Sequence, residues 1–144
     1  MTEYSNRLIN IFADSTARCF EYTAKVGIDS YTFAKKFMHS KSGYSMLMEL
    51  DIKPFNSFRY MLEIVQEEIK VGQGVAYDSY VMWMYGYLIK YWTAYRDITP
   101  EQIWKILPVD KFNEMFNFYH TQGWNYIIDD ATEAYKRSVL NEIK

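Results

Sequence analysis

The sequence predicts a single all-α domain, a bundle of six or seven helices around one aromatic-rich helix at about residues 79–96. Three observations support this fold class. Apolar residues recur at steps of three and four along most of the chain, which is the period of a helix with one buried face. No segment shows the sustained two-residue alternation of a half-buried strand. With one exception, prolines and glycines fall between the periodic segments, as expected of helices joined by short turns.

Two helices are predicted at the start of the chain. The first covers about residues 3–26, where apolar side chains fall on one face. Gly27 follows it in the usual position after a helix C-terminus. A second, short helix begins at Asp29 or Ser30, because either side chain can accept a hydrogen bond from the unpaired N–H groups of a first turn.

One further regular helix is predicted before the middle of the chain. The pair Ser42-Gly43 ends the second helix, and residues 44–50 are expected to add one or two helical turns. The regular helix starts at Pro54, since proline is tolerated in a first turn. The stretch 71–74, Val-Gly-Gln-Gly, ends this helix and is the best candidate for a hinge within the single domain of residues 1–144. The apolar stripe of the helix consists of Phe55, Phe58, Leu62, Val65 and Ile69.

The central helix opens at Asp78 or Ser79 and is apolar or aromatic nearly all the way round. Lys90 is its only charge before Arg96. A helix that is apolar on every side is usually buried by several neighbours. Gly86 is the exception among the glycines: it lies inside this helix, where glycine costs about 1 kcal/mol relative to alanine. We therefore predict that Gly86 permits a close crossing with another helix.

Three more helices are predicted after the central one. The run Thr99-Pro100-Glu101-Gln102 has the features of a capping box, with proline at the first helical position. Pro108 ends this short helix, and another begins at Asp110 and ends near Gly123. The last helix covers about residues 125–142.

The charge distribution gives little support to a nucleic-acid surface. The formal net charge is −2, and neither half of the chain is basic. The densest positive group is Lys35, Lys36, His39 and Lys41, which is more typical of a solvated helix face.

Several features predict a soluble protein of the cytoplasm. Cys19 is the single cysteine, which excludes a disulfide framework within the chain. The first residues lack the basic and then apolar pattern of a signal peptide. The longest uncharged run, residues 79–89, is too short to cross a bilayer.

No motif predicts an enzyme, a cofactor or a metal site. His39 and His120 are far apart and show no ligand spacing. Asp129 and Asp130 are adjacent, so on a helix they point about 100° apart and form no shared acid–base site by themselves. The protein is therefore expected to be non-enzymatic.

The segment 77–95 carries eight tyrosines and tryptophans, and most of them are expected in the core. Two bulky faces on one helix are hard to cover in a domain this small. Tyrosine and tryptophan are also enriched at the hot spots of protein interfaces. The predicted partner-binding residues are Tyr80, Trp83, Tyr85, Tyr91, Trp92 and His120.

The same residues carry a resemblance. The runs Tyr80-Val-Met-Trp-Met-Tyr-Gly-Tyr-Leu-Ile-Lys-Tyr-Trp92, Ile98-Thr-Pro-Glu-Gln-Ile-Trp104, Phe118-Tyr-His-Thr-Gln-Gly123 and Ile127-Ile-Asp-Asp130 resemble small helical proteins of unknown function in Firmicutes. The run 28–40 is similar to the N-terminal part of longer members. Some relatives are encoded beside ADP-ribosyltransferase-like toxins and look like antitoxin or immunity proteins. The chain departs from the pattern at Pro108-Val-Asp, where a longer helix is expected.

Three functions follow as hypotheses. The first is a protein-binding module, by the resemblance a bacterial antitoxin or immunity protein that sequesters a partner encoded beside it; a second copy of the chain is the other candidate partner. The second is a small-molecule-binding protein or enzyme with a pocket lined by tyrosines and His120. The third is a DNA-binding protein that uses Lys35, Lys36 and Lys41, against which the weak positive charge argues.

Overall fold

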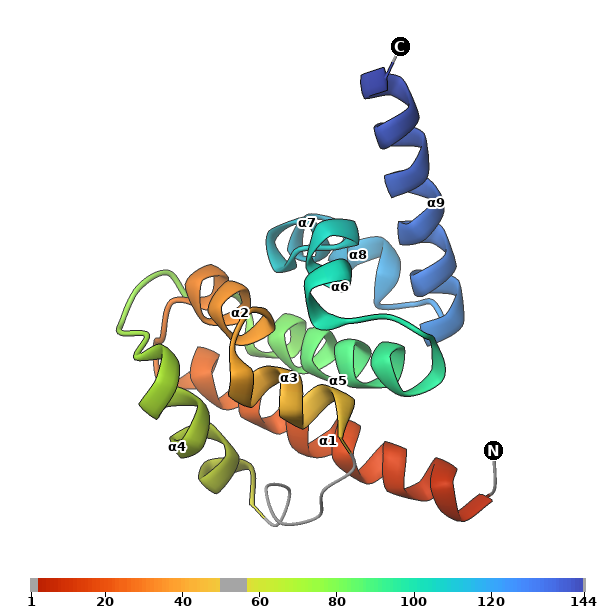
Figure 1. The fold of residues 1–144 in the computed structure, drawn as a ribbon. Coiled ribbons are helices and arrows are strands. Elements are labelled where there is room, and N and C mark those ends of the chain that lie inside the picture. Colours follow the sequence, from red (N-terminus) through yellow and green to blue (C-terminus); the bar gives the residue numbers. More distant parts are fainter. Residues whose placement is uncertain (1–2, 50–56, 144) are drawn as a thin grey trace.

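The structure, a computed structural model, describes residues 3–49 and 57–143 and is all-helical over these ranges, which confirms the predicted fold class (Figure 1). Nine helices follow one another within them, more than the six or seven predicted. They are α1 (Glu3–Lys25), α2 (Ser30–Met38), α3 (Lys41–Met48), α4 (Phe58–Ile69), α5 (Ser79–Tyr95), α6 (Pro100–Ile106), α7 (Val109–Glu114), α8 (Phe116–Tyr119) and α9 (Trp124–Ile143).

The difference in number has a local cause. The single helix expected from Asp110 is divided at Met115 into α7 and the four-residue α8. The turns expected from residue 44 belong to α3 as far as Met48, and α3 already begins at Lys41 because Ser40 caps its first turn. The prediction that Ser42-Gly43 ends the second helix was wrong, because both residues lie inside α3. The predicted start at Pro54, with Phe55, lies outside the described residues, and α4 begins at Phe58.

Several predicted helix ends are confirmed by their hydrogen bonds. Asp78 caps α5 by accepting from the Tyr80 N–H at 2.8 Å. Thr99 and Gln102 form both hydrogen bonds of the predicted capping box at the start of α6. Gly27, after α1, adopts a φ of +80°, a conformation that favours glycine.

Helix α5 is the central element, and it packs antiparallel along α1. Asn6 and Asn10 near the start of α1 bond Tyr95 and Tyr87 in the second half of α5, while Ala17 lies against Gly86. Figure 1 shows α1 running alongside α5. Helices α2 and α3 lie over another side of α5, and α6 to α8 lie on the side of α5 that faces away from α1.

Gly86 lies at the crossing of α5 with α1, as predicted. A Cβ atom built on Gly86 would stand 2.9 Å from the Ala17 Cα and 2.9 Å from the Thr16 carbonyl oxygen. Both are backbone atoms, which cannot move aside as the end of a side chain can. The absence of a side chain at this position therefore sets how closely the two helices approach.

Helix α3 is held at both ends by charged side chains from other helices. The Glu68 carboxylate of α4 accepts from the Lys41 and Ser42 N–H groups at 2.8 and 2.9 Å. The Lys90 ammonium of α5 donates to the Met46 and Leu47 carbonyls at 3.0 and 2.9 Å. A negative group at the first turn and a positive group at the last turn both match the helix dipole.

The segment proposed as a hinge is bonded to the turn between α1 and α2. The Asp29 N–H donates to the Gly72 carbonyl, the Gly74 N–H to the Gly27 carbonyl, and the Ser30 N–H to the Val75 carbonyl, each at 3.0 Å. Movement at residues 71–74 would have to break these bonds, and the hinge stays a prediction.

Helix α9 begins against the other helices, and its C-terminal half projects away from them (Figure 1). Ile127, Ile128 and Ala131 in its first half are buried, whereas Leu140 near its end is exposed. No helix in the described ranges is both long and apolar enough to cross a membrane.

Gly86→Ala is expected to destabilise the protein by about 1–3 kcal/mol, although alanine is the better helix former, because its methyl group would push against the α1 backbone. Gly72→Ala is the control, since nothing lies within 4 Å of its Cβ position. Chemical denaturation would measure both. A Gly86→Ala protein as stable as the control would contradict the crossing.

Lys90 makes the free energy of unfolding depend on pH. Its side chain is 1% exposed, and burial lowers its pKa from 10.5 to about 8. Between these values the unfolded state binds a proton that the folded state lacks, so the free energy of unfolding rises with pH. Relative to Lys90→Met, the wild type should gain about 2 kcal/mol between about pH 7.5 and about pH 9.5.

The comparison with Lys90→Met isolates this effect, because the other titrating groups are shared. Burial raises the pKa of Cys19 to about 12 and the pKa of Tyr85 above the usual value, so both oppose the gain in either protein. Parallel curves of unfolding free energy against pH for the two proteins would show that Lys90 is not responsible.

Candidate partner-binding surface

A continuous row of seven aromatic rings runs along the outer side of α5. We call it the aromatic ladder. Five rings come from α5, one from α8 and one from the first residue of α9, so that three elements meet in it. Its members are Tyr80, Trp83, Tyr87, Tyr91, Tyr95, Phe116 and Trp124.

Neighbouring rings of the ladder are in contact. The Tyr80 and Trp83 rings are parallel with centroids 6.2 Å apart, and Trp83 is stacked on Tyr87 at 5.3 Å. Trp124 then stacks on Tyr87 at 4.8 Å and contacts Tyr91 at 6.3 Å. Tyr91 and Tyr95 continue the row at 4.5 Å, and Phe116 meets Tyr80 edge-on at 5.5 Å. Such separations lie within the range of favourable aromatic pairs.

The helical period places these rings on one face of α5. Positions 80, 83, 87 and 91 are three or four residues apart and therefore lie above one another. The adjoining face of α5 carries the core residues Val81, Tyr85, Leu88 and Trp92, which are buried.

Two asparagine side chains of α1 hold the hydroxyls of two ladder tyrosines. The Tyr95 hydroxyl donates to the Asn6 Oδ1 at 2.8 Å, and the Tyr87 hydroxyl to the Asn10 Oδ1 at 3.1 Å. Burial raises the pKa of both tyrosines, which keeps the two hydroxyls protonated and able to donate. The rings are thus fixed by stacking along the row and by hydrogen bonds across it.

The structure divides the predicted partner-binding residues into two groups. Tyr80 is 50% exposed, and Trp83 and Tyr91 are half-buried members of the ladder. Tyr85 and Trp92 are 0% and 1% exposed, so their assignment to a contact surface was wrong. Both belong to the core, where the Tyr85 hydroxyl donates to the Leu107 carbonyl at 2.9 Å.

His120 is exposed at the Phe116 end of the ladder. Its ring is stacked on Phe116 with centroids 5.2 Å apart, and its Nδ1 lies 2.9 Å from the Phe116 carbonyl oxygen. Since a carbonyl oxygen only accepts, Nδ1 carries the hydrogen. This local role is the one expected of an imidazole near a helix end.

The prediction from the sequence did not include four residues of the ladder. Tyr87 and Tyr95 could have been found, because they share the helical face of Tyr80 and Trp83. Phe116 and Trp124 carry no such signal, since their place depends on how the chain turns back between α5 and α9.

An open depression of about 550 Å³ lies beside the ladder at Trp83. Arg18 pairs with Asp14 at 2.9 Å on its rim. The Arg59 guanidinium lies over the Tyr22 ring at 5.6 Å. The depression therefore combines aromatic surface with charges of both signs, as interface rims do. Its lining is Asp14, Arg18, Glu21, Tyr22, Lys25, Phe58, Arg59 and Trp83.

Cysteine and potential metal ligands of the described residues have the following placement. Burial raises the pKa of Cys19 to about 12, which keeps it a thiol rather than a nucleophilic thiolate. No group of three or more His, Cys, Asp or Glu side chains in the described ranges is placed to hold a metal ion. Tyr119 and Asp130 are bonded to each other at 2.7 Å between the hydroxyl and Oδ2.

Comparisons of this chain with family models, with curated proteins and with solved structures gave no match.

A double-mutant cycle tests whether the ladder is a packed unit. Tyr87→Leu and Trp124→Leu should each destabilise the protein. Their effects should not add, because the two rings stack on each other at 4.8 Å. The expected coupling free energy is about 0.5–1.5 kcal/mol by chemical denaturation. Additive effects would mean that the two rings are independent. Tyr60→Leu paired with Trp124→Leu is the control, since Tyr60 is on α4 outside the ladder.

Proposed function

We propose that this protein is a non-enzymatic protein-binding module that contacts its partner through the aromatic ladder. The observation that carries the proposal is the exposed end of an ordered row of rings. Tyr80 remains 50% exposed although its ring is in contact with both Trp83 and Phe116. Large aromatic surface that is ordered but uncovered is typical of interaction sites.

The order of the ladder favours binding. Association normally costs about 0.5–1.5 kcal/mol for each flexible side chain that becomes fixed. The rings of Tyr87 and Tyr95 are already held by stacking and by Asn10 and Asn6. A partner that covers the ladder would therefore fix few additional side chains of this protein. Less of the favourable free energy of burial would then be offset by lost side-chain entropy, and binding would be tighter.

The more specific form of the proposal is an antitoxin or immunity protein that sequesters a toxin encoded beside it. The resemblance of the ladder segment and its neighbours to toxin-associated helical proteins supports this partner. A second copy of this chain is the other occupant that such a surface can take, and the two are separated by the oligomeric state of the purified protein.

No observation favours a ligand pocket lined by tyrosines and His120. His120 is exposed and lies in none of the open depressions at Trp83, at α2 and α3, or beside Tyr135. A small-molecule site at His120 therefore stays a hypothesis without structural support.

Tyr80→Ala should weaken binding to the product of the adjacent gene at least about tenfold, because tyrosine is enriched at interface hot spots, where truncation to alanine costs about 2 kcal/mol or more. Isothermal titration calorimetry with the two purified proteins would measure the change. Tyr60→Ala is a matched control, because Tyr60 is 52% exposed and lies on α4.

Equal affinities for the Tyr80 and Tyr60 variants would contradict the ladder as the contact surface. If the adjacent product does not bind, sedimentation of the protein alone tests the second copy. A monomer throughout, with no binding of the adjacent product, would contradict the proposed function.

A further inference from the structure

A second mixed surface lies on α2, away from the ladder. It carries Lys35, Lys36 and His39, all of which are exposed, and Lys41 follows at the start of α3. None of the three lysines forms an ion pair with a carboxylate of the described residues. Glu68 lies at Lys41, where it accepts from the backbone N–H, so the two lysines of α2, Lys35 and Lys36, are the positive charges of this surface without a carboxylate partner among the described residues.

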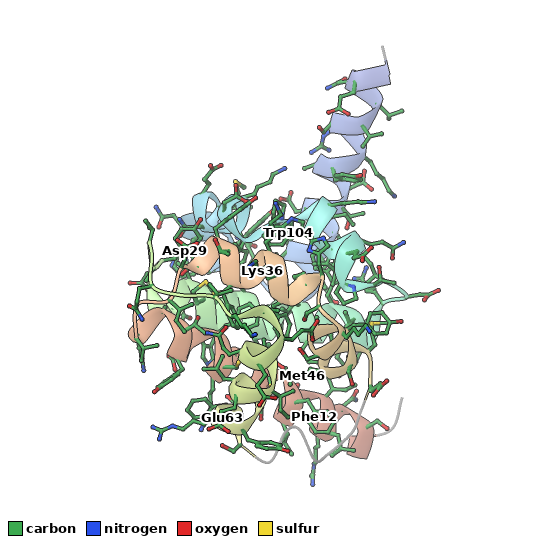
Figure 2. The ribbon with its side chains drawn as sticks, turned by 60° about the vertical axis from the view of Figure 1, so that its left-hand side comes forward. Phe12, Asp29, Lys36, Met46, Glu63 and Trp104 are labelled. Atoms are coloured by element: carbon green, nitrogen blue, oxygen red, sulfur yellow. The ribbon has the colours of Figure 1, made fainter. Side chains whose placement is uncertain are left out.

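Aromatic rings lie among these charges. Trp104 of α6 contacts the Tyr31 ring with centroids 5.6 Å apart and the His39 ring at 6.1 Å. The Lys35 ammonium lies 5.9 Å from the centre of the Tyr31 ring. Figure 2 shows Lys36 on α2 and Trp104 on α6 next to each other on the same side of the molecule. The three rings and the lysines therefore form one surface built from α2, the start of α3 and α6.

One depression on this surface has no carboxylate in its lining. It has a volume of about 350 Å³, and its lining is Tyr31, Thr32, Lys35, Lys36 and His39. Two neighbouring depressions also reach His39, but one includes Glu68 and the other includes Glu49 and Glu101. An anion is repelled by those carboxylates, so the first depression is the one suited to it.

The nearby carboxylate of Asp29 is already engaged. It accepts from the Thr32 N–H at 3.0 Å and from the Val75 N–H at 3.0 Å, and these bonds lower its pKa. In the same way the Glu68 carboxylate is held by the first turn of α3. Neither carboxylate forms an ion pair with the lysines of α2.

His39 has one ring nitrogen committed. Its Nδ1 lies 2.6 Å from the Lys35 carbonyl oxygen, which only accepts, so Nδ1 carries a hydrogen and Nε2 is the remaining polar atom of the ring. The bond also fixes the ring against Trp104. His39 thus joins the positive groups of α2 to the aromatic rings.

From this arrangement we propose that the α2 depression binds a nucleoside phosphate. The ammonium groups of Lys35 and Lys36 and the hydroxyl of Thr32 supply the donors that a phosphate group requires. The rings of Tyr31, His39 and Trp104 supply the aromatic surface on which a nucleobase stacks. A free mononucleotide and a unit of single-stranded nucleic acid present the same chemistry, and the test separates them.

The test is an NMR titration of the ¹⁵N-labelled protein with adenosine monophosphate, uridine monophosphate, adenosine and inorganic phosphate. Because the depression is open and shallow, we expect a Kd between about 0.1 and about 1 mM for the mononucleotides. The amides of α2 and the Trp104 indole should shift. Adenosine alone and phosphate alone should each bind at least about fivefold more weakly, since each lacks one half of the contacts.

Variants locate the site. Lys35→Gln with Lys36→Gln should weaken mononucleotide binding at least about tenfold, as two charged donors are lost. The control is Lys136→Gln with Arg137→Gln, which changes the net charge equally on the projecting end of α9. Trp104→Leu should weaken binding about fivefold, and Tyr126→Leu, at a 48% exposed position of α9 outside the ladder, should leave it unchanged.

A single-stranded oligouridine in a parallel titration separates the two sources of ligand. Binding much tighter than that of uridine monophosphate, and falling steeply with salt, assigns the site to nucleic acid. If oligouridine binds no more tightly per nucleotide than uridine monophosphate, the site is assigned to free nucleotides. The proposal is overturned if no α2 resonance shifts at about 10 mM mononucleotide, if phosphate alone binds as well as a mononucleotide, or if the α9 control weakens binding as much as the α2 variant.

Discussion

The close approach of α1 and α5 at Gly86 is the constraint on which the rest of the fold depends. The Ala17 Cα and the Thr16 carbonyl oxygen occupy the space that a side chain at Gly86 would need. With α1 this near, the inner positions of α5, such as Tyr85 and Trp92, are fully buried. The same orientation turns the face of Tyr80 and Trp83 outwards between α1 and α9. A core and an aromatic surface thus arise from one helix because its rotation is fixed at a single crossing.

Long-range polar contacts complete the packing around this pair of helices. Helix α3 is short, so its stability depends on tertiary contacts more than on its own propensity. Glu68 bonds its first N–H groups and Lys90 its last carbonyls, and both charges match the helix dipole. Lys90 remains buried because the carbonyls replace part of its lost hydration, although burial still lowers its pKa to about 8.

Local signals in the sequence predicted most of the helices and the crossing at Gly86, but neither the division at Met115 nor the start of α3 at Lys41. They were insufficient for the candidate surface. Tyr85 and Tyr87 are two residues apart and chemically identical, yet one is core and the other belongs to the ladder. A helix that is apolar all round gives no direction for its buried face. That face follows from tertiary contacts, as do the positions of Trp124, of Asn6 and Asn10, and of the α3 carbonyls that receive Lys90.

Hydrogen exchange of the four tryptophan indole N–H groups tests most directly whether α5 has the rotation described. Trp92 is 1% exposed, whereas Trp83, Trp104 and Trp124 are half-buried. The indole of Trp92 should therefore exchange only through global unfolding, and the Trp83 and Trp124 indoles of the ladder should exchange much faster through the native state. Rapid exchange at Trp92, or protection of Trp83 and Trp124 equal to that of Trp92, would contradict the division of α5 into a core face and an exposed aromatic face.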